Sequence, residues 1–246
     1  MVLTDDVRTL YWHPLSSEDM CACTEAKLGK IIMRLGSYYR SLANRYIGVH
    51  SKGQSILDVG SYDGFFLSQM RALSRVAVDL HPAKQQFHPL LPADVYHLPF
   101  REDSFETILA LDVLEHLLDD RGAVAALLDI LSPNGLLWLS VPCAGFKVFP
   151  AWLTNWLHRR WGHVRPGYTG QQLFELVGGQ GTVTIRYWNE PVFRLAYLPL
   201  RLLWVLFPGV VKWLLRCIVA LDALWTDGTS GHIYARIEKV TPRSNT

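Results

Sequence analysis

The sequence has little of several features that would assign a protein to a class at once. Its four cysteines in 246 residues are too few and too scattered for a disulfide framework, and Cys21 and Cys23 lack the C-x-x-C spacing of common zinc or redox sites. No metal site is predicted, and a reducing compartment is indicated. The 24 basic and 22 acidic residues leave a net charge of +2, which excludes a nucleic-acid binder that acts through bulk positive charge.

No apolar run is long enough to cross a bilayer as a helix. The run from Leu202 to Val211 is about half of a span, and basic residues lie on both sides of it. The amino terminus carries Asp5 and Asp6 where an export signal would have a basic and then an apolar stretch. We therefore expect a cytoplasmic protein.

Short apolar runs of strand length alternate with segments of helical periodicity. This alternation predicts an α/β fold in which parallel strands are joined by right-handed helical crossovers. A capping box formed by Thr169 and Gln172 predicts the start of one helix, and the turn-prone Ser132 to Gly135 predicts the end of another. The predicted helices span 25–47, 65–73, 121–131 and 171–177, and the predicted strands span 55–59, 75–79, 106–111, 136–141, 182–188 and an antiparallel 232–238.

Acidic residues follow the predicted strands at their carboxyl ends, where open α/β sheets bind their ligands. The loop after the first strand turns at Gly60 and reaches a helix start at Gly64, which leaves backbone N–H groups free for a carboxylate or phosphate. The spacing differs from the G-x-G-x-x-G of dinucleotide sites, which disfavours a nicotinamide oxidoreductase. The acids are Asp58, Asp79, Asp94 and Asp112.

These residues resemble the class I S-adenosylmethionine-dependent methyltransferases, particularly the group that includes the quinone methyltransferases. The resemblance rests on ILDVGSYDG, VAVDLHP, ADVYHLPFREDSFETILALDVLEHL and LSPNGLLWLSVP, which occur in the family's order and spacing. It covers about residues 55–142 strongly and the later elements loosely. It implies a Rossmann-like, seven-stranded, mostly parallel sheet with helices on both faces, and S-adenosyl-L-methionine as cofactor.

The resemblance also implies a role for single residues at the strand ends. The sequence departs from the family at Tyr62, where a second glycine is usual. The implied cofactor residues are Asp58, Gly60 and Gly64 around the methionine part, Asp79 at the ribose hydroxyls, Asp94 and Val95 at adenine, and Asp112 near the amino group.

The acceptor side of the site has weaker signals. Methyl transfer to a hydroxyl needs a group that removes a proton, and His116 and His163 are the candidate bases. Arg165 and Tyr168 share with His163 a His-x-Arg-x-x-Tyr-Thr pattern that resembles the family, and they are predicted to bind the acceptor. The alternatives are a structural role for Glu115-His116 at a helix start, and an ordinary basic surface loop around Arg165.

Seven of the nine tryptophans follow residue 150, mostly in two segments that a minimal sheet-and-helix domain does not need. The later segment, 189–231, is apolar, and its charges from Val192 to Leu224 are almost all basic, as in helices that lie in a membrane interface. The alternative is a hydrophobic lid packed on the domain's own core or on a second subunit. We divide the chain into an N-terminal helical segment 1–50, a cofactor-binding core 51–142, an acceptor segment 143–188, the apolar insertion or lid 189–231 before the last strand, and the last strand with its tail 232–246.

The sequence therefore predicts an S-adenosyl-L-methionine-dependent methyltransferase that O-methylates an apolar or lipid-linked acceptor at a membrane surface. We expect it in the cytoplasm, peripheral on the inner face of the membrane, with no nucleic-acid partner. Two alternatives remain: a soluble small-molecule methyltransferase with a hydrophobic lid, and a non-catalytic cofactor-binding interaction protein.

Overall fold

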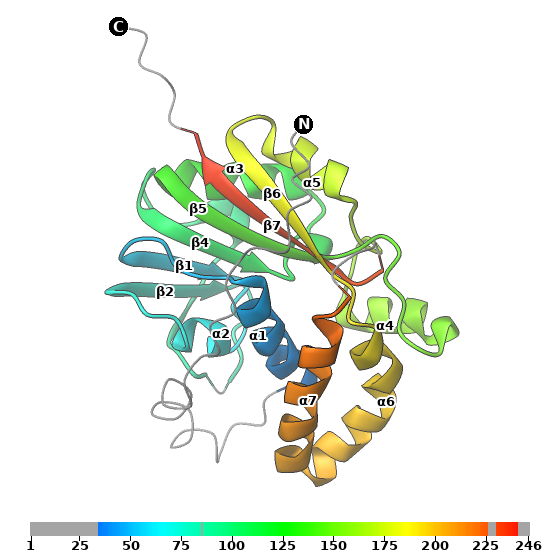
Figure 1. Ribbon diagram of the computed structural model, residues 1–246. Helices are drawn as coiled ribbons and strands as arrows, with labels where there is room; N and C mark the ends of the chain where they lie inside the picture. The colour runs from blue at the N-terminus through cyan, green and yellow to red at the C-terminus, as the bar shows by residue number, and fades with distance from the viewer. Residues whose placement is uncertain (1–33, 85, 226–229, 241–246) are drawn as a thin grey trace, which may run out of the picture. The chain divides into compact units, whose positions relative to one another are not determined.

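A computed structural model describes residues 34–84, 86–225 and 230–240 of the chain. Their seven strands form one sheet in the order β3-β2-β1-β4-β5-β7-β6 (Figure 1). The strands are β1 Ser55–Val59, β2 Ser74–Asp79, β3 Leu90–Pro92, β4 Phe105–Leu111, β5 Leu131–Pro142, β6 Gly181–Trp188 and β7 His232–Lys239. The α-helices are α1 Leu35–Ile47, α2 Phe65–Ser68, α3 Asp120–Ile130, α4 Thr154–Trp161, α5 Gly170–Val177, α6 Pro191–Leu206 and α7 Pro208–Asp222, with 3-10 turns at Val95–His97, Leu114–His116 and Ala151–Leu153.

Strands β1 to β5 are parallel, and β7 runs antiparallel to both β5 and β6. This arrangement confirms the predicted seven-stranded, mostly parallel sheet with an antiparallel last strand. Periodicity missed β3, because three residues ending in proline carry no repeat. The turn predicted at Ser132–Gly135 is wrong. These residues form the irregular start of β5, with Asn134 at a positive φ of 58°.

Apolar side chains alternate between the two faces of the sheet, so two separate cores form. Along β5, Leu137 and Leu139 pack into the core beneath α3 and α5, whereas Leu136 and Trp138 pack into the core beneath α1, α2, α6 and α7. The predicted placement of helices on both faces is therefore confirmed.

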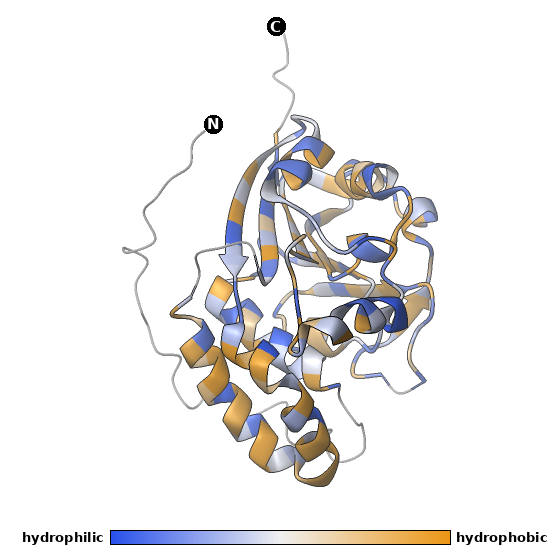
Figure 2. Cartoon of the chain, turned by 90° about the vertical axis from the view of Figure 1, so that its right-hand side faces the viewer, coloured by the Kyte–Doolittle hydropathy of each residue, from blue (hydrophilic) through white to orange (hydrophobic). Residues whose placement is uncertain are grey.

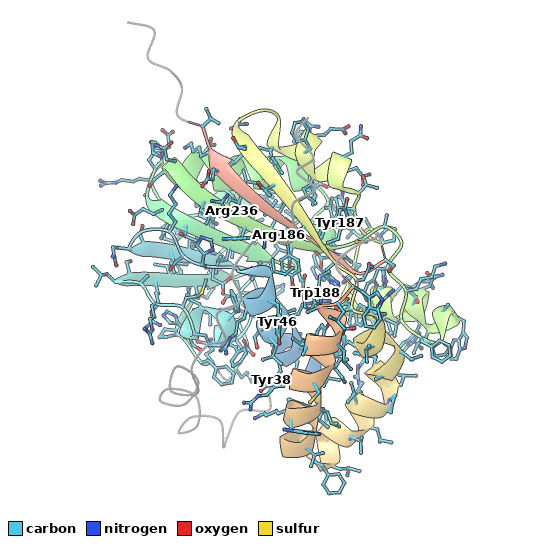
Figure 3. The ribbon with its side chains drawn as sticks, viewed as in Figure 1. Tyr38, Tyr46, Arg186, Tyr187, Trp188 and Arg236 are labelled. Carbon is cyan, nitrogen blue, oxygen red and sulfur yellow. The ribbon has the colours of Figure 1, made fainter. Side chains whose placement is uncertain are left out.

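Helix α1 covers the carboxyl end of β6. The Tyr46 and Trp188 rings lie 6.0 Å apart, and Arg186 donates to the carbonyl of Ile47 at 2.9 Å (Figure 3). The part of the predicted helix before residue 34 lies outside the described residues. Helix α2 is shorter than predicted and ends at Ser68.

The segment between β6 and β7 folds into a hairpin of α6 and α7, which lies beside α1 (Figure 1). Asp222 joins the end of α7 to the start of α6. Its carboxylate accepts the N–H groups of Val192 and Phe193. Buried positions Val211, Leu215 and Val219 recur along one face of α7. Apolar residues also cover much of the outside of the hairpin (Figure 2).

No helix in the described part of the chain is long and apolar enough to span a membrane. Cys143 and Cys217 are free thiols. Cys21 and Cys23 lie outside the described residues.

Candidate functional site

The four predicted acids lie along one edge of the sheet. Asp58 is the next-to-last residue of β1, Asp79 ends β2, and Asp112 directly follows β4. Asp94 follows β3 and caps the turn Val95–His97. The chain runs from β1 outward to β2 and β3 and then returns to β4 on the other side of β1, so β1 and β4 flank a topological switch point. Such a point is where open α/β sheets bind ligands.

The Asp79 carboxylate organises the loop around it. Its Oδ2 accepts the N–H of Tyr62 at 2.8 Å, and its Oδ1 accepts the N–H of His81 at 2.7 Å. Each carboxylate oxygen keeps a second lone pair for a ligand hydroxyl. Asp79 is thus an oriented acceptor pair at the end of β2.

Tyr62 adopts the left-handed conformation that a glycine would favour, with φ 53°. Its N–H is held by Asp79, its carbonyl accepts the N–H of Ala83 at 2.8 Å, and its ring lies 3.9 Å below the guanidinium of Arg34. These contacts offset the cost, of order 1–2 kcal/mol, of a side chain in this conformation. The loop therefore accommodates a tyrosine at the position where the family usually has a glycine.

Asp58 is a buried acid with no cationic partner among the described residues. Burial raises its pKa to about 7, although the hydroxyl of Ser61 donates to it and favours the charged form. The neighbouring charges of Asp63 and Asp79 raise the pKa further. A ligand cation beside Asp58 would stabilise the carboxylate. The Asp58 carboxylate therefore suits a ligand that carries positive charge at this end of the site.

Gly60 and Gly64 are both left-handed, with φ 72°, and both allow close packing within the chain. A Cβ on Gly60 would lie 2.5 Å from a methyl of Val113, and one on Gly64 would lie 2.7 Å from the Cβ of His88. Gly64 thus makes room for the segment before β3. Gly60 brings the loop after β1 against the loop after β4, which closes the site at the switch point.

Asp94 and Val95 lie at the far end of the row, after β3. Asp94 accepts the N–H of Tyr96 at 3.1 Å, and its carboxylate lies 3.9 Å from the ring of His97. Val95 is buried in the core shared with α3. The two residues are brought together as predicted, and Asp94 is the one with atoms open to a ligand.

Asp112 belongs to a network of charges that the sequence did not indicate. Its Oδ2 lies 3.4 Å from Nε of Arg40, and its Oδ1 accepts the hydroxyl of Ser140 at 2.7 Å. Arg40 also pairs with Glu190 at 2.7 Å, and His232 lies 2.8 Å from the same carboxylate. Burial raises the pKa of Asp112 and Glu190, but Arg40 and His232 outweigh burial and lower both.

This network encloses a basic residue of the first helix. Arg40 has only 18% of its side chain exposed and lies inside, between Asp112 and Glu190. Arg40 comes from α1, Glu190 from the loop between β6 and α6, and His232 from the start of β7, so no local spacing could group them. Nothing in the spacing of α1 marks Arg40 as buried.

The two candidate bases, His116 and His163, lie side by side, and the role of either as a base stays a prediction. Their ring centres are 4.9 Å apart, and Nδ1 of His116 lies 3.2 Å from the carbonyl of Gly162. Burial and the neighbouring imidazoles of His116 and His158 lower the pKa of His163 to about 4, so it is neutral at pH 7. Glu115 is buried beside them, and burial together with the charge of Asp112 raises its pKa well above the usual range.

Arg165 and Tyr168 use their polar atoms within the protein. Arg165 pairs with Asp120 and donates to the carbonyl of Leu117 at 2.8 Å. The hydroxyl of the buried Tyr168 lies 2.9 Å from Asp120 and 3.0 Å from the carbonyl of Leu114. Both residues fasten the acceptor segment to the loop after β4, which positions the two histidines. The contacts seen here are structural, and acceptor binding by these residues stays a prediction.

A family model described as a methyltransferase domain matches residues 31–185, which is more than half of the chain. No match was found among curated protein sequences.

Several solved structures share the fold. One is an S-adenosylmethionine-dependent methyltransferase from Archaeoglobus fulgidus, with 14% identity, a TM-score of 0.54, and coverage of 84% of this chain and 95% of that one. Another is the [4+2]-cyclase SpnF, with 16% identity, a TM-score of 0.53, and coverage of 84% and 82%. A third is Haemonchus contortus phosphoethanolamine N-methyltransferase 2, solved with phosphomonomethylethanolamine and S-adenosylhomocysteine, with 13% identity, a TM-score of 0.53, and coverage of 84% and 53%. At these identities the likeness shows the fold.

Proposed function

Since the chain belongs to the methyltransferase family defined by this domain and uses S-adenosyl-L-methionine as cofactor, we propose that it methylates a hydroxyl oxygen of an apolar or lipid-linked acceptor at a membrane surface. The observation that carries this proposal is the large exposed apolar face of the α6–α7 hairpin, which lies beside α4 of the acceptor segment (Figure 1). The cofactor supplies an electrophilic methyl group. The protein must bind it, orient the acceptor and receive a proton.

We assign the cofactor to the row of acids. Asp79 would accept the ribose hydroxyls, and Asp94 would accept the exocyclic amine of adenine beside Val95. Because Arg40 already neutralises Asp112, we assign the positive charge of the methionine part to Asp58, which has no cationic partner in the part of the chain that the structure describes. Gly60, in the loop after β1, would let the backbone approach the cofactor between Asp58 and Asp112.

The hairpin exposes many large apolar side chains together, whereas an ordinary protein surface exposes them singly. Leu202, Val205 and Trp213 are exposed by 68%, 78% and 62%. The only acid between residues 191 and 222 is Asp222, which is buried, whereas Arg201 and Arg216 are exposed. An apolar face bordered by basic residues, with tryptophan at the edge, suits an interface with anionic lipid.

A second element extends this face toward the reaction site. Trp152 and Trp156, beside and within α4, are also exposed, and Arg160 lies 5.9 Å from the Trp156 ring. Helix α4 contacts α6 through the rings of Trp161 and Tyr197, 6.4 Å apart. The same helix ends at Gly162, next to His163. An acceptor that rises from a lipid surface would therefore meet the histidines first.

The imidazoles supply the proton acceptor in this proposal. The carbonyl of Gly162 can only accept, so Nδ1 of His116 carries the hydrogen and Nε2 keeps its lone pair. His163 is neutral at pH 7 because of its low pKa. Either ring can take the hydroxyl proton as the oxygen attacks the methyl group.

The membrane part is tested by flotation of the purified protein with anionic and zwitterionic vesicles. We expect binding to anionic vesicles, and we expect the double variant Lys212→Glu, Arg216→Glu to lose most of it, because each basic residue near the surface contributes about 1 kcal/mol. The matched control is Arg75→Glu, Arg101→Glu, which makes the same change in net charge at the amino ends of β2 and β4. Equal binding by wild type and both variants, or a stable dimer that covers the hairpin, would favour the lid or subunit alternative.

The chemical part is tested with labelled S-adenosyl-L-methionine and a lipid extract. Transfer of label to a product soluble in organic solvent supports the apolar acceptor. Saturable cofactor binding with no transfer to any apolar or polar extract would favour the non-catalytic alternative.

A further inference from the structure

Three side chains at the end of the loop after β4 are grouped in a way that methyl transfer does not require. Glu115, His116 and His163 each offer a ligand atom, and these atoms lie within 4.8 Å of one another. The sequence spacing predicts no metal site, because His163 comes from a different segment. The loop after β4 and the end of α4 bring the three together.

Two of the three side chains hold buried polar atoms without a partner in the described residues. Glu115 is only 1% exposed, and its Oε2 makes no hydrogen bond. Nδ1 of His163 is likewise buried and unpartnered. A buried carboxylate oxygen without a donor is costly, so some group from outside the chain is expected to satisfy it.

His116 is prepared as a ligand by its other nitrogen. Its Nδ1 hydrogen points to the carbonyl of Gly162, at 3.2 Å, which fixes the ring and leaves Nε2 unprotonated. Metal-binding histidines almost always have such a second bond to a carbonyl or carboxylate. The backbone N–H of Val164 donates to the carbonyl of Glu115 at 2.9 Å, which ties the two segments of the cluster together.

We infer that Glu115, His116 and His163 form a binding site for one divalent first-row transition metal ion, with Zn²⁺ as the preferred occupant. Two imidazoles and one carboxylate are a ligand set for such ions, and the imidazoles disfavour Mg²⁺ and Ca²⁺. Tetrahedral coordination would bring the ligand atoms to about 3.3 Å from one another, so binding of the ion would draw the three side chains closer together. Three protein ligands leave a fourth position open, as in catalytic zinc sites.

What the cation would do rests on the proposed function. Asp112 acts electrostatically on both Glu115 and His163, and it directly follows β4 at the switch point of the sheet. A hydroxyl bound to the cation would lose its proton more easily. The histidines would then serve as ligands, and the cation would take over activation of the acceptor oxygen.

The test uses the full chain, freed of metal by a chelator and titrated with Co²⁺, which reports its coordination by visible absorption. We expect one equivalent of Co²⁺ to bind, Zn²⁺ to displace it, and metal analysis of untreated protein to find a transition metal. Glu115→Gln keeps the size of the side chain, and we expect it and His163→Ala to weaken Co²⁺ binding at least about 10-fold. His50→Ala, on an exposed histidine before β1, is the matched control and should bind as the wild type does.

S-adenosyl-L-methionine binding and melting curves of the same preparations separate the possible failures. If the folded protein binds the cofactor but shows no saturable Co²⁺ binding, the cation site is overturned and the histidines remain the bases of the proposed function. Co²⁺ binding that both variants retain would overturn the ligand assignment. Co²⁺ binding that only the control retains supports the site, even in a protein that fails to bind the cofactor.

Discussion

Replacement of Asp79 by alanine is the most direct test of the cofactor site. The carboxylate ends β2, and its two oxygens already accept the backbone N–H groups of Tyr62 and His81 at 2.8 and 2.7 Å. These bonds fix the carboxylate plane so that the remaining lone pairs can meet two adjacent ribose hydroxyls. Hydrogen bonds to a charged group are worth about 1.5–3 kcal/mol, so Asp79→Ala should weaken cofactor binding by roughly 10- to 150-fold.

The assay is titration calorimetry with S-adenosyl-L-methionine. Asp129→Ala, which removes an exposed acid on α3, is the matched control and should bind as the wild type does. Because Asp79 also holds Tyr62 in its left-handed conformation, part of the loss could come from the loop. An analogue of S-adenosylhomocysteine without the two ribose hydroxyls separates the two causes.

Wild type and Asp79→Ala should bind that analogue with similar affinity if the carboxylate acts on the ribose. The same penalty with and without the hydroxyls would mean that Asp79 acts only through the loop. Unchanged affinity for S-adenosyl-L-methionine itself would refute the assignment of the whole row of acids.

Two further predictions concern the hairpin and the buried acid of β1. Leu215 is 0% and Leu202 is 68% exposed, so Leu215→Ala should lower the free energy of unfolding in urea by about 2–5 kcal/mol and Leu202→Ala by less than about 0.5 kcal/mol; similar losses would mean that the two faces of the hairpin are not distinct. The pKa of Asp58 is raised to about 7, so its contribution to stability is complete below pH 4 and is lost as the pH rises through 7. Relative to Asp58→Asn, the wild type should therefore lose a few kcal/mol of stability between pH 4 and 8, and parallel stability curves would contradict the raised pKa.

Most of the strands and the row of acids followed from the sequence because their causes are local, whereas the three-residue β3 did not. A buried parallel strand is a short apolar run, and the acid lies at or next to the end of that run. The strand β1 was therefore predicted from Ser55 to Val59, with the bounds that the structure has. The capping box of Thr169 and Gln172 is a matter of three residues and is also confirmed. The family's motifs then gave the cofactor, because its binding loops follow consecutive strands.

Only the tertiary structure decided which charges are inside. Arg40 reads as one of several basic residues on a helix, yet packing of α1 against the ends of β6 and β7 encloses it with Asp112, Glu190 and His232. The division of the hairpin into a packed and an exposed face, and the meeting of Glu115 with His163, have the same origin. Spacing along the chain determines which residues share a helix or a strand. The burial of a side chain and its pairing with others depend on which segments the order of strands in the sheet brings together. No single segment determines that order.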